Sequence, residues 1–170
     1  MVESFAMEVE QRVRAAVAAL DMDHELLDCD PELADTNAFC AHYGYDLDRS
    51  ANTIVVASKR PPGHYAACVV LATTRLDVNK TVRDLMDVRK LSFAPADVTA
   101  EVTGMIMGGV TPFALPPDLP LYVDSAVMDR DWVIVGGGSR SLKIKISPQA
   151  LVAVGGRAIT GLANPVPQPQ

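Results

Sequence analysis

The first apolar pattern in the chain has the period of an amphipathic α-helix. Between residues 3 and 20, apolar side chains recur at steps of three and four residues, which places them on one helix face. Glu8 with Arg12 and Glu10 with Arg14 are oppositely charged pairs four residues apart, an arrangement that favours a helix. The pattern therefore predicts a helix from Glu3 to Leu20, with Phe5, Val9, Val13, Val17 and Leu20 on its apolar face.

A β-hairpin is predicted near the middle of the chain. Thr53–Ala57 is a run of β-branched and apolar residues that is typical of a buried strand, and Tyr65–Ala72 is a second such run. The segment Lys59–Gly63 combines basic residues with two prolines and a glycine, so we expect an exposed hairpin loop there.

Start and stop signals predict further helices. Asp35 is placed to cap a helix that ends near Tyr43, with Gly44 as its stop. Asp77 is placed to cap a helix that ends near Asp87, and Ala94–Asp97 opens a short helix that ends near Gly104. The acidic stretch 21–35 contains Pro31, and no element is predicted before Asp35.

The second half of the chain contains mostly strand candidates and glycine loops. In Leu142–Ile146, apolar residues alternate with Lys143 and Lys145, which predicts a half-buried strand with both lysines facing outward. Ser147 and Pro148 are typical of the start of a short last helix. The other strand candidates are Leu121–Asp124 and Trp132–Val135.

The order of these elements favours an α+β fold. Helices and strands interleave, but the later strands follow one another closely, which a doubly wound sheet does not explain. No linker or internal repeat divides the chain, so we expect a single domain over residues 1–162, with an extra N-terminal helix within residues 1–24. Residues 163–170 are rich in proline and glutamine and are predicted to be a disordered tail.

Composition excludes several classes of protein. With 49% apolar and 21% charged residues among 170, the chain is a globular domain and not a disordered one. No apolar stretch is long enough to span a membrane. The first ten residues hold three glutamates and no basic residue, unlike a signal or transit peptide, so a cytoplasmic protein is expected.

The charge of the chain is unevenly distributed. The net charge is -6, with -9 in residues 1–50 and +3 in residues 51–170. Proteins that bind nucleic acid on their own usually carry a stronger basic surface, so tight binding of nucleic acid is expected to need a partner. The acidic first third is interpreted as a solvated face, or alternatively as a surface that docks on a synthetase.

Metal and cofactor sites are not indicated. The three cysteines are widely spaced and form no C-x-x-C motif, and the three histidines have no metal-like spacing. We therefore expect buried free thiols, no metal and no cofactor. These residues are Cys29, Cys40 and Cys68, and His24, His42 and His64.

Two segments, Thr103–Pro112 and Val133–Arg140, are denser in glycine than ordinary turns. Glycine lets backbone N–H groups converge on an anion or a carbonyl oxygen, but it also occurs at barrel corners and tight hairpins, and both interpretations stay open. Neither segment is a nucleotide phosphate loop. No G-x-S-x-G motif indicates a serine hydrolase.

Two charged residues accompany these segments. Asp124 follows the apolar residues Leu121–Val123 and is either an anchor for backbone N–H groups or a ligand-binding group. Arg140 follows the triple glycine and is a candidate to bind a phosphate or to pair with Asp124.

Five ordered segments within about residues 25–155 resemble the YbaK / prolyl-tRNA-synthetase-associated domain family of aminoacyl-tRNA editing domains. The resemblance implies a curved, barrel-like mixed sheet with flanking helices. It also implies hydrolysis of the ester between a wrong amino acid and the 3′ end of a tRNA, for instance alanine or cysteine on proline tRNA. The segments are Ala51–Val56, Ser92–Pro95, Thr103–Gly104 with Gly108–Pro112, Val123–Asp124, and Gly136–Arg140.

The resemblance also implies which residues form the site. Gly104, Gly108 and Gly109 are expected to border the pocket for the aminoacyl group and the terminal adenosine, with their backbone groups positioning the ester and the attacking water. The substrate-binding residues near or under that pocket are expected to be Thr111, Asp124, Gly137, Ser139 and Arg140.

The chain departs from the family at Asn52, because many members have a lysine directly before this strand. Lys59 is no simple substitute, since it has the opposite strand parity and lies ~23 Å away along an extended strand. Three interpretations remain: Asn52 orients a water or the ribose hydroxyl in catalysis, the substrate differs, or hydrolysis has been lost.

Two functions follow from these interpretations. The first is a trans-acting deacylase that hydrolyses the ester of a misacylated tRNA carrying a small amino acid, with Asn52 among its catalytic residues. The alternative is a non-catalytic module that binds aminoacyl-tRNA, a nucleotide or a synthetase. The expected partner is the 3′ end of a misacylated tRNA, and a synthetase is a second candidate.

Overall fold

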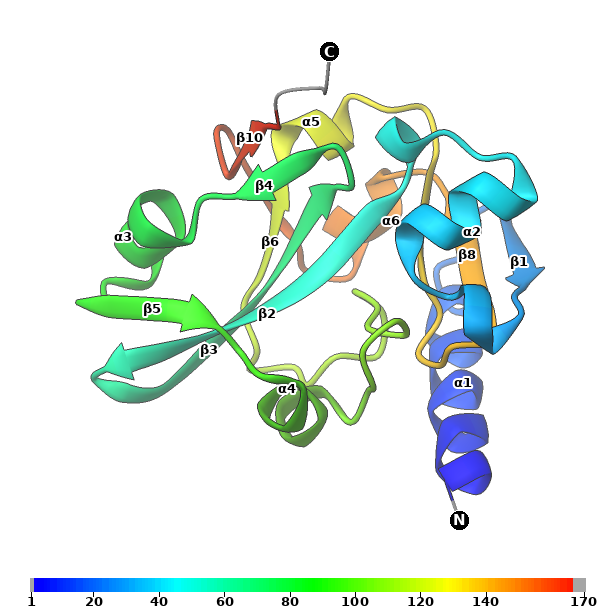
Figure 1. Cartoon of the computed structure of the whole chain (residues 1–170), viewed down its shortest axis with the longest axis horizontal. Coiled ribbons are helices and arrows are strands. Elements are labelled where there is room, and N and C mark those ends of the chain that lie inside the picture. Colours follow the sequence, from blue (N-terminus) through cyan, green and yellow to red (C-terminus); the bar gives the residue numbers. More distant parts are fainter. Residues whose placement is uncertain (1, 167–170) are drawn as a thin grey trace.

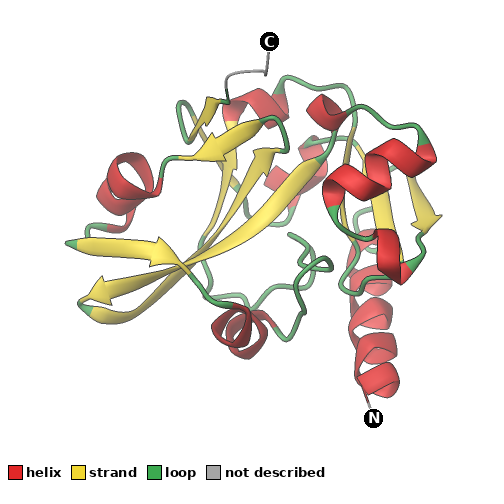
Figure 2. Ribbon diagram, in the orientation of Figure 1, coloured by secondary structure: helices red, strands yellow, loops and turns green. Residues whose placement is uncertain are grey.

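A twisted five-stranded mixed sheet lies at the centre of the computed structural model, which describes residues 2–166 (Figures 1 and 2). Its strand order is β5-β2-β3-β6-β9. The strands β2 (Ala51–Arg60) and β3 (Pro62–Leu71) form a long antiparallel hairpin, and β5 (Lys90–Phe93) pairs antiparallel with β2. Parallel pairs add β6 (Leu121–Asp124) and β9 (Arg157–Ile159) on the other side of β3.

Two smaller sheets complete the strand structure of residues 2–166. In one, β8 (Leu142–Ile146) lies between β1 (His24–Asp28) and β7 (Val133–Gly136), and both pairs are antiparallel. In the other, β4 (Thr74–Leu76) pairs with β10 (Ala163–Pro165). The α+β class is confirmed, and within the described residues the strands form these three sheets without closing a barrel.

The helices follow most of the predicted signals. Gly44 ends α2 in the left-handed conformation with φ 78°, and Gly104 ends α4 in the same way with φ 74°. Asp77 accepts hydrogen bonds from the backbone and hydroxyl of Thr81 and so caps a π-helical turn that leads into α3. The helices are α1 (Val2–Ala18), α2 (Thr36–Tyr43), α3 (Arg83–Met86), α4 (Ala96–Thr103), α5 (Ser125–Met128) and α6 (Gln149–Ala153).

The main hydrophobic core joins α1 to the strands. Val9, Val13 and Val17 of α1 are buried in the same cluster as residues of β2, β3, β6, β7 and β8. The helix approaches Gly138 so closely that a Cβ there would lie 2.9 Å from both Val9 and Val13. The predicted helix is thus confirmed, but it is an integral part of the core and not an appendage.

Three local predictions are corrected. Residues 24–28, for which no element was predicted, form the edge strand β1. Residues 163–165, expected in a disordered tail, pair with β4 as β10, while 167–170 lie outside the described residues. Asp35 precedes α2, but its side chain makes no capping hydrogen bond because it pairs with Arg140.

Candidate functional site

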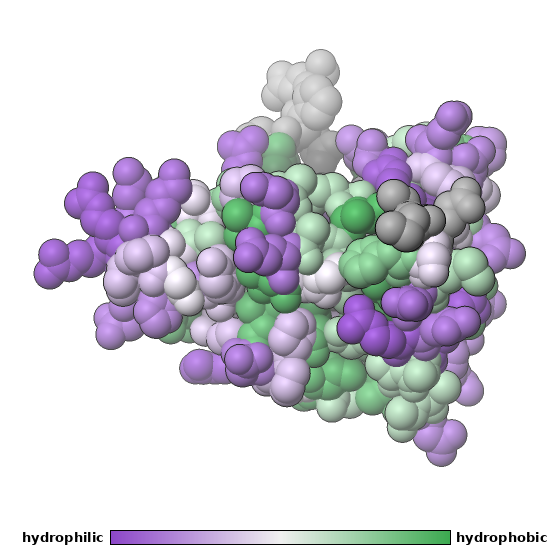
Figure 3. Space-filling model, turned by 90° about the horizontal axis from the view of Figure 1, so that it is seen from below, coloured by the Kyte–Doolittle hydropathy of each residue, from purple (hydrophilic) through white to green (hydrophobic). Residues whose placement is uncertain are grey.

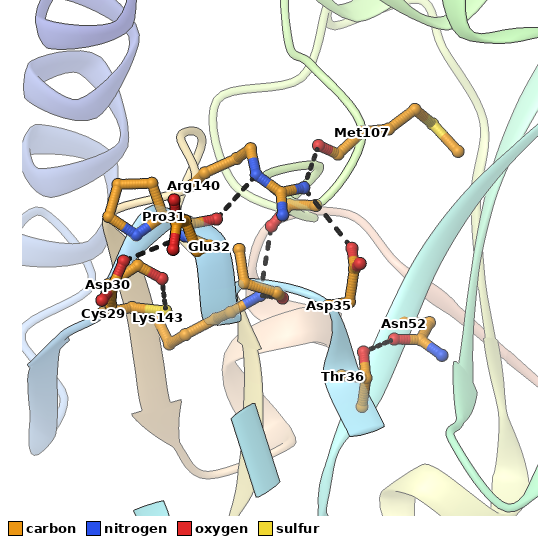
Figure 4. A network of polar contacts seen from close by, with 12 residues as sticks. Cys29, Asp30, Pro31, Glu32, Asp35, Thr36, Asn52, Met107, Arg140 and Lys143 are labelled. Atoms are coloured by element: carbon orange, nitrogen blue, oxygen red, sulfur yellow. Dashed lines mark hydrogen bonds and ion pairs between the residues drawn. The ribbon is translucent and has the colours of Figure 1, made fainter. Parts of the chain in front are cut away.

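A cleft of about 240 Å³ opens where β2 begins, between the start of α2 and the loop that carries Met107 and Gly108 (Figure 4). Segments that are far apart in the sequence meet here because the Ser50–Ile134 bridge joins the start of β2 to β7. The lining residues are Ala34, Asp35, Thr36, Phe39, Ser50, Ala51, Asn52, Thr53, Ile54, Met107, Gly108, Val110, Ile134, Gly136 and Lys143.

Small residues bring backbone to the surface of this cleft. Gly136 lies so close to the facing loop that a Cβ would stand 2.3 Å from the carbonyl oxygen of Val110. Gly108 adopts φ 86°, a conformation that favours glycine, and a Cβ there would collide with the Arg140 guanidinium at 2.1 Å. Both glycine-rich segments thus contribute a wall, and the second also forms the β7–β8 hairpin.

Asn52 projects into the cleft from the second position of β2. Its Oδ1 accepts a hydrogen bond of 2.6 Å from the hydroxyl of Thr36, in the first turn of α2. This contact orients the amide, whose nitrogen lies on the side away from Thr36 (Figure 4). A neutral donor is therefore held in place where the family resemblance led us to expect a lysine.

A lysine does line the cleft, but it comes from β8. The side chain of Lys143 is buried, and its Nζ donates hydrogen bonds to the carbonyl oxygens of Ala34 at 2.7 Å and Gly108 at 3.1 Å (Figure 4). The ammonium also lies 5.7 Å from the centre of the Phe39 ring. Burial lowers the pKa of Lys143 below its usual value. The prediction that Lys143 faces solvent is wrong.

Arg140 bridges the two walls at the rim of the cleft. Its Nε donates to the carbonyl of Pro31 at 2.9 Å, and its NH1 donates to the carbonyl of Met107 at 3.1 Å. The same NH1 lies 3.4 Å from the carboxylate of Asp35 (Figure 4). The ionic partner of Arg140 is thus Asp35 and not Asp124.

Several residues implied by the resemblance lie behind the cleft wall. The carbonyl of Gly109 accepts from the backbone of Gly138 at 2.7 Å, and a Cβ on Gly109 would lie 2.7 Å from the Ser139 backbone. Gly137 packs against Leu142, and Thr111 is fully buried. The hydroxyl of Ser139 donates to Glu10 of α1, and Gly104 lies at the end of α4 near Arg12.

Asp124 lies at the end of β6 and is 3% exposed. Burial raises the pKa of its carboxyl group, and backbone groups of Ala163 and Leu162 partly offset this effect. The residue does not line the cleft. Of the residues implied by the resemblance, the structure thus brings only Asn52 and Gly108 to the cleft surface, with Arg140 at its rim.

Lys143 is the basic residue of the cleft that sequence reasoning missed, and Thr36, which orients Asn52, was missed as well. The sequence contained a signal for Lys143, because this residue follows the glycine-rich segment on the next strand. The alternation of apolar and basic residues nevertheless predicted that its side chain points outward. Residues 2–166 contain no group of three or more His, Cys, Asp or Glu side chains placed to hold a metal ion. Among the helices of these residues, none is both long and apolar enough to cross a bilayer.

Comparison with protein families gives a match to the aminoacyl-tRNA editing domain over residues 30–154. Uncharacterized protein YwhH from Bacillus subtilis (strain 168) is 31% identical over 108 residues, which are 64% of this chain and 66%, or just under two thirds, of that protein.

Solved structures share the fold. The crystal structure of hypothetical protein APE2540 superposes with a TM-score of 0.80 at 27% identity, covering 90% of this chain and 99% of that one. A crystal structure of a proposed trans-editing enzyme for prolyl tRNA synthetase superposes with a TM-score of 0.75 at 19% identity, covering 89% of this chain and 95% of that one.

Proposed function

Because the chain belongs to the aminoacyl-tRNA editing domain family, we propose that it hydrolyses the ester of a misacylated tRNA carrying a small amino acid. The observation that carries this proposal is the cleft of about 240 Å³ between Asn52 and Gly108, which lies within the matched residues. Ligand pockets for drug-sized molecules are larger, at ~300–1,000 Å³. The volume therefore favours a small aminoacyl group.

The proposed reaction uses water and backbone groups. Water, or a group on the substrate itself, attacks the ester carbonyl, and backbone N–H groups of the glycine-rich wall stabilise the developing oxyanion. One such donor lowers the free energy of the transition state by about 3 kcal/mol. Asn52, oriented by Thr36, holds the ribose hydroxyl or the attacking water through its amide nitrogen.

The proposed partner is the 3′ end of a tRNA. Exposed basic side chains gather where the tip of the β2–β3 hairpin meets β5: Lys59, Arg60, Arg89 and Lys90. We call this group the basic tip, and Figure 3 shows a hydrophilic surface at that end of the molecule. The tip lies about 26 Å along β2 from Asn52, so a tRNA with its 3′ end in the cleft can place its helical stem there.

A synthetase partner belongs to the same proposal. It is supported by the fold shared with the proposed trans-editing enzyme for prolyl tRNA synthetase. On α1, the exposed apolar side chains of Phe5 and Met7 are available for docking, whereas Val9, Val13 and Val17 are in the core.

The competing function is binding without hydrolysis. Asn52 favours it, because a neutral amide replaces the lysine that many family members have at this position. Hydrolysis and binding make different predictions for the stability of the aminoacyl ester in the complex, so one assay separates them.

The test is to incubate the purified protein with alanyl-, cysteinyl- and seryl-tRNAs and to follow loss of the ester. We expect selective hydrolysis of one species and a rate at least about tenfold lower for Asn52→Ala, since the variant removes a hydrogen bond to the reacting groups. Asn79→Ala, at an exposed position outside the cleft, is the matched control and should keep the wild-type rate.

No hydrolysis of any of the three esters by a folded protein that still binds them would reject deacylation and support the binding module. In that case, gain of hydrolysis by Asn52→Lys would show that the chain keeps the site of a hydrolase and has lost activity through the residue at position 52.

A further inference from the structure

The ammonium of Lys143 is buried in the cleft without a carboxylate to balance its charge. Among the side chains of residues 4–166, no carboxylate oxygen lies within 4.0 Å of its Nζ, and the nearby ionisable groups are Asp35, Arg140, Cys29 and Cys40. Asp35 is itself bound to Arg140. Removing a charge from water is costly, so a buried lysine is expected to have a compensating partner.

The hydrogen bonds of Lys143 leave room for such a partner. An ammonium carries three N–H donors. Two of them bond to the carbonyls of Ala34 and Gly108, and these bonds fix the position of Nζ against the two walls of the cleft. Because the side chain also lines the cleft, its third donor is available to a bound molecule.

We propose that Lys143 is the cation of this site and that its third N–H binds an anionic oxygen of the ligand. The ligand's identity rests on the proposed function, which offers two such oxygens: the phosphate of the terminal nucleotide and the oxyanion that develops from the ester. The positive charge of the site then comes from β8, while Asn52 on β2 supplies a neutral amide.

This assignment also links the ligand to the glycine loop. The carbonyl of Gly108 holds Nζ, while the Met107 carbonyl holds Arg140, so consecutive residues of one loop are fixed by two cations (Figure 4). A ligand oxygen bound by Lys143 therefore lies beside the backbone that borders the cleft.

The variant that tests the proposal is Lys143→Gln, which retains N–H donors for the two carbonyls but removes the charge. Lys145→Gln is the matched control on the same strand, because Lys145 pairs with Glu25 and lies over Trp132 outside the cleft. The double variant Lys143→Gln/Asn52→Lys returns a cation to the cleft from β2. Urea unfolding of each variant monitors the folded state.

Two ligands are used as probes. The first is 3′-alanylamino-3′-deoxyadenosine, whose amide replaces the labile ester, and the second is its 5′-phosphate. Their dissociation constants are measured by calorimetry, alongside kcat and KM for the aminoacyl-tRNA that the wild type hydrolyses.

We expect Lys143→Gln to lose at least about tenfold in probe affinity or in kcat, with Lys145→Gln unchanged and the double variant partly restored. Loss confined to the phosphorylated probe identifies the phosphate as the partner. Unchanged probe affinity with a lower kcat identifies the ester oxyanion.

The proposal is overturned if Lys143→Gln has the same probe affinity and the same rate as Lys145→Gln. It is also overturned if Lys143→Gln loses affinity or rate because it unfolds, and the added substitution Asn52→Lys does not restore them. A wild type that binds the probes but hydrolyses no ester rejects the proposed deacylation, while the affinity of Lys143→Gln still decides the role of the cation. A wild type that binds neither probe and hydrolyses no ester rejects both.

Discussion

Burial shifts the pKa of one carboxyl group and one ammonium group, those of Asp124 and Lys143. For Asp124 it raises the pKa above the ordinary 3.8, and for Lys143 it lowers the pKa below the ordinary 10.5. In each case burial favours the neutral form, so a change of pH alters the charge of each residue differently in the folded protein and in solvent.

Asp124 makes the folded state bind a proton more tightly than the unfolded state. Its contribution to stability is therefore fully present below pH 3.8 and is lost as pH rises through the raised pKa. We expect the free energy of unfolding of the wild type, relative to Asp124→Asn, to decrease across that interval. Urea unfolding of both proteins at several pH values measures it, and a difference between them that stays constant with pH would contradict this expectation.

Lys143 leads to an expectation for ligand binding. Its ammonium loses a proton at a lower pH than a solvated lysine, so affinity for the phosphorylated or oxyanionic ligand should fall as pH rises through the lowered pKa. Binding measured from neutral to alkaline pH checks this. A Lys143→Gln variant with the same alkaline decline would contradict it.

Gly109 is expected to be a packing position. Because an alanine Cβ would meet the Ser139 backbone at 2.7 Å, Gly109→Ala should destabilise the fold by about 1–3 kcal/mol. Gly161→Ala meets no atom within 4 Å and carries only the strain of φ 76°, so chemical denaturation should show a smaller loss.

At the scale of residues, the sequence predicted which side chains alternate on β8 but not what covers them. The Leu-Lys-Ile-Lys-Ile pattern places both lysines on one face. Only the tertiary structure brings Ala34 and Phe39 over the Lys143 end of that face, while Lys145 remains beside Glu25. Periodicity cannot show that contact, because its partners lie more than a hundred positions earlier in the chain.

At the scale of elements, a strong apolar pattern was sufficient and a weak one was not. The β2–β3 hairpin was predicted because its strands contain continuous β-branched and apolar runs, and α1 because its apolar residues follow one helical period. The edge strand β1 has exposed polar positions, and its cross-strand pair Glu25–Lys145 joins two distant parts of the sequence. Such a strand resembles a loop until its partner is known.

The basic tip is an element whose role can be measured separately from the cleft. Arg60→Gln with Lys90→Gln should weaken tRNA binding and make the dependence of log affinity on log salt shallower by about 2, since two phosphate contacts are lost. Filter binding at several salt concentrations measures the slope. Arg14→Gln with Arg157→Gln removes the same charge at other exposed positions and should leave the slope nearly unchanged.

At the scale of the whole molecule, the folding unit is larger than the family match. The match begins at residue 30, but α1 contributes to the main core and Glu10 accepts a hydrogen bond from Ser139. Removing residues 1–20 should therefore unfold the protein and not merely delete a docking surface.

A milder change tests the same point. Val13→Ala should lower the free energy of unfolding by about 2 kcal/mol, because it leaves a cavity at a fully buried position. Gln11→Ala, on the exposed side of the same helix, should change it little. Equal unfolding curves for the two variants would show that α1 is dispensable.

The pairing of β1 with β8 has a consequence for how the protein is made. His24 lies opposite Ile146, so β1 leaves the ribosome first among the described strands but cannot pair until β8 has been synthesised. Ser139 and Gly138, which hold α1, are also synthesised late. The nascent chain therefore presents an unpaired strand and the apolar face of a helix through most of translation, and during that time both are accessible to chaperones.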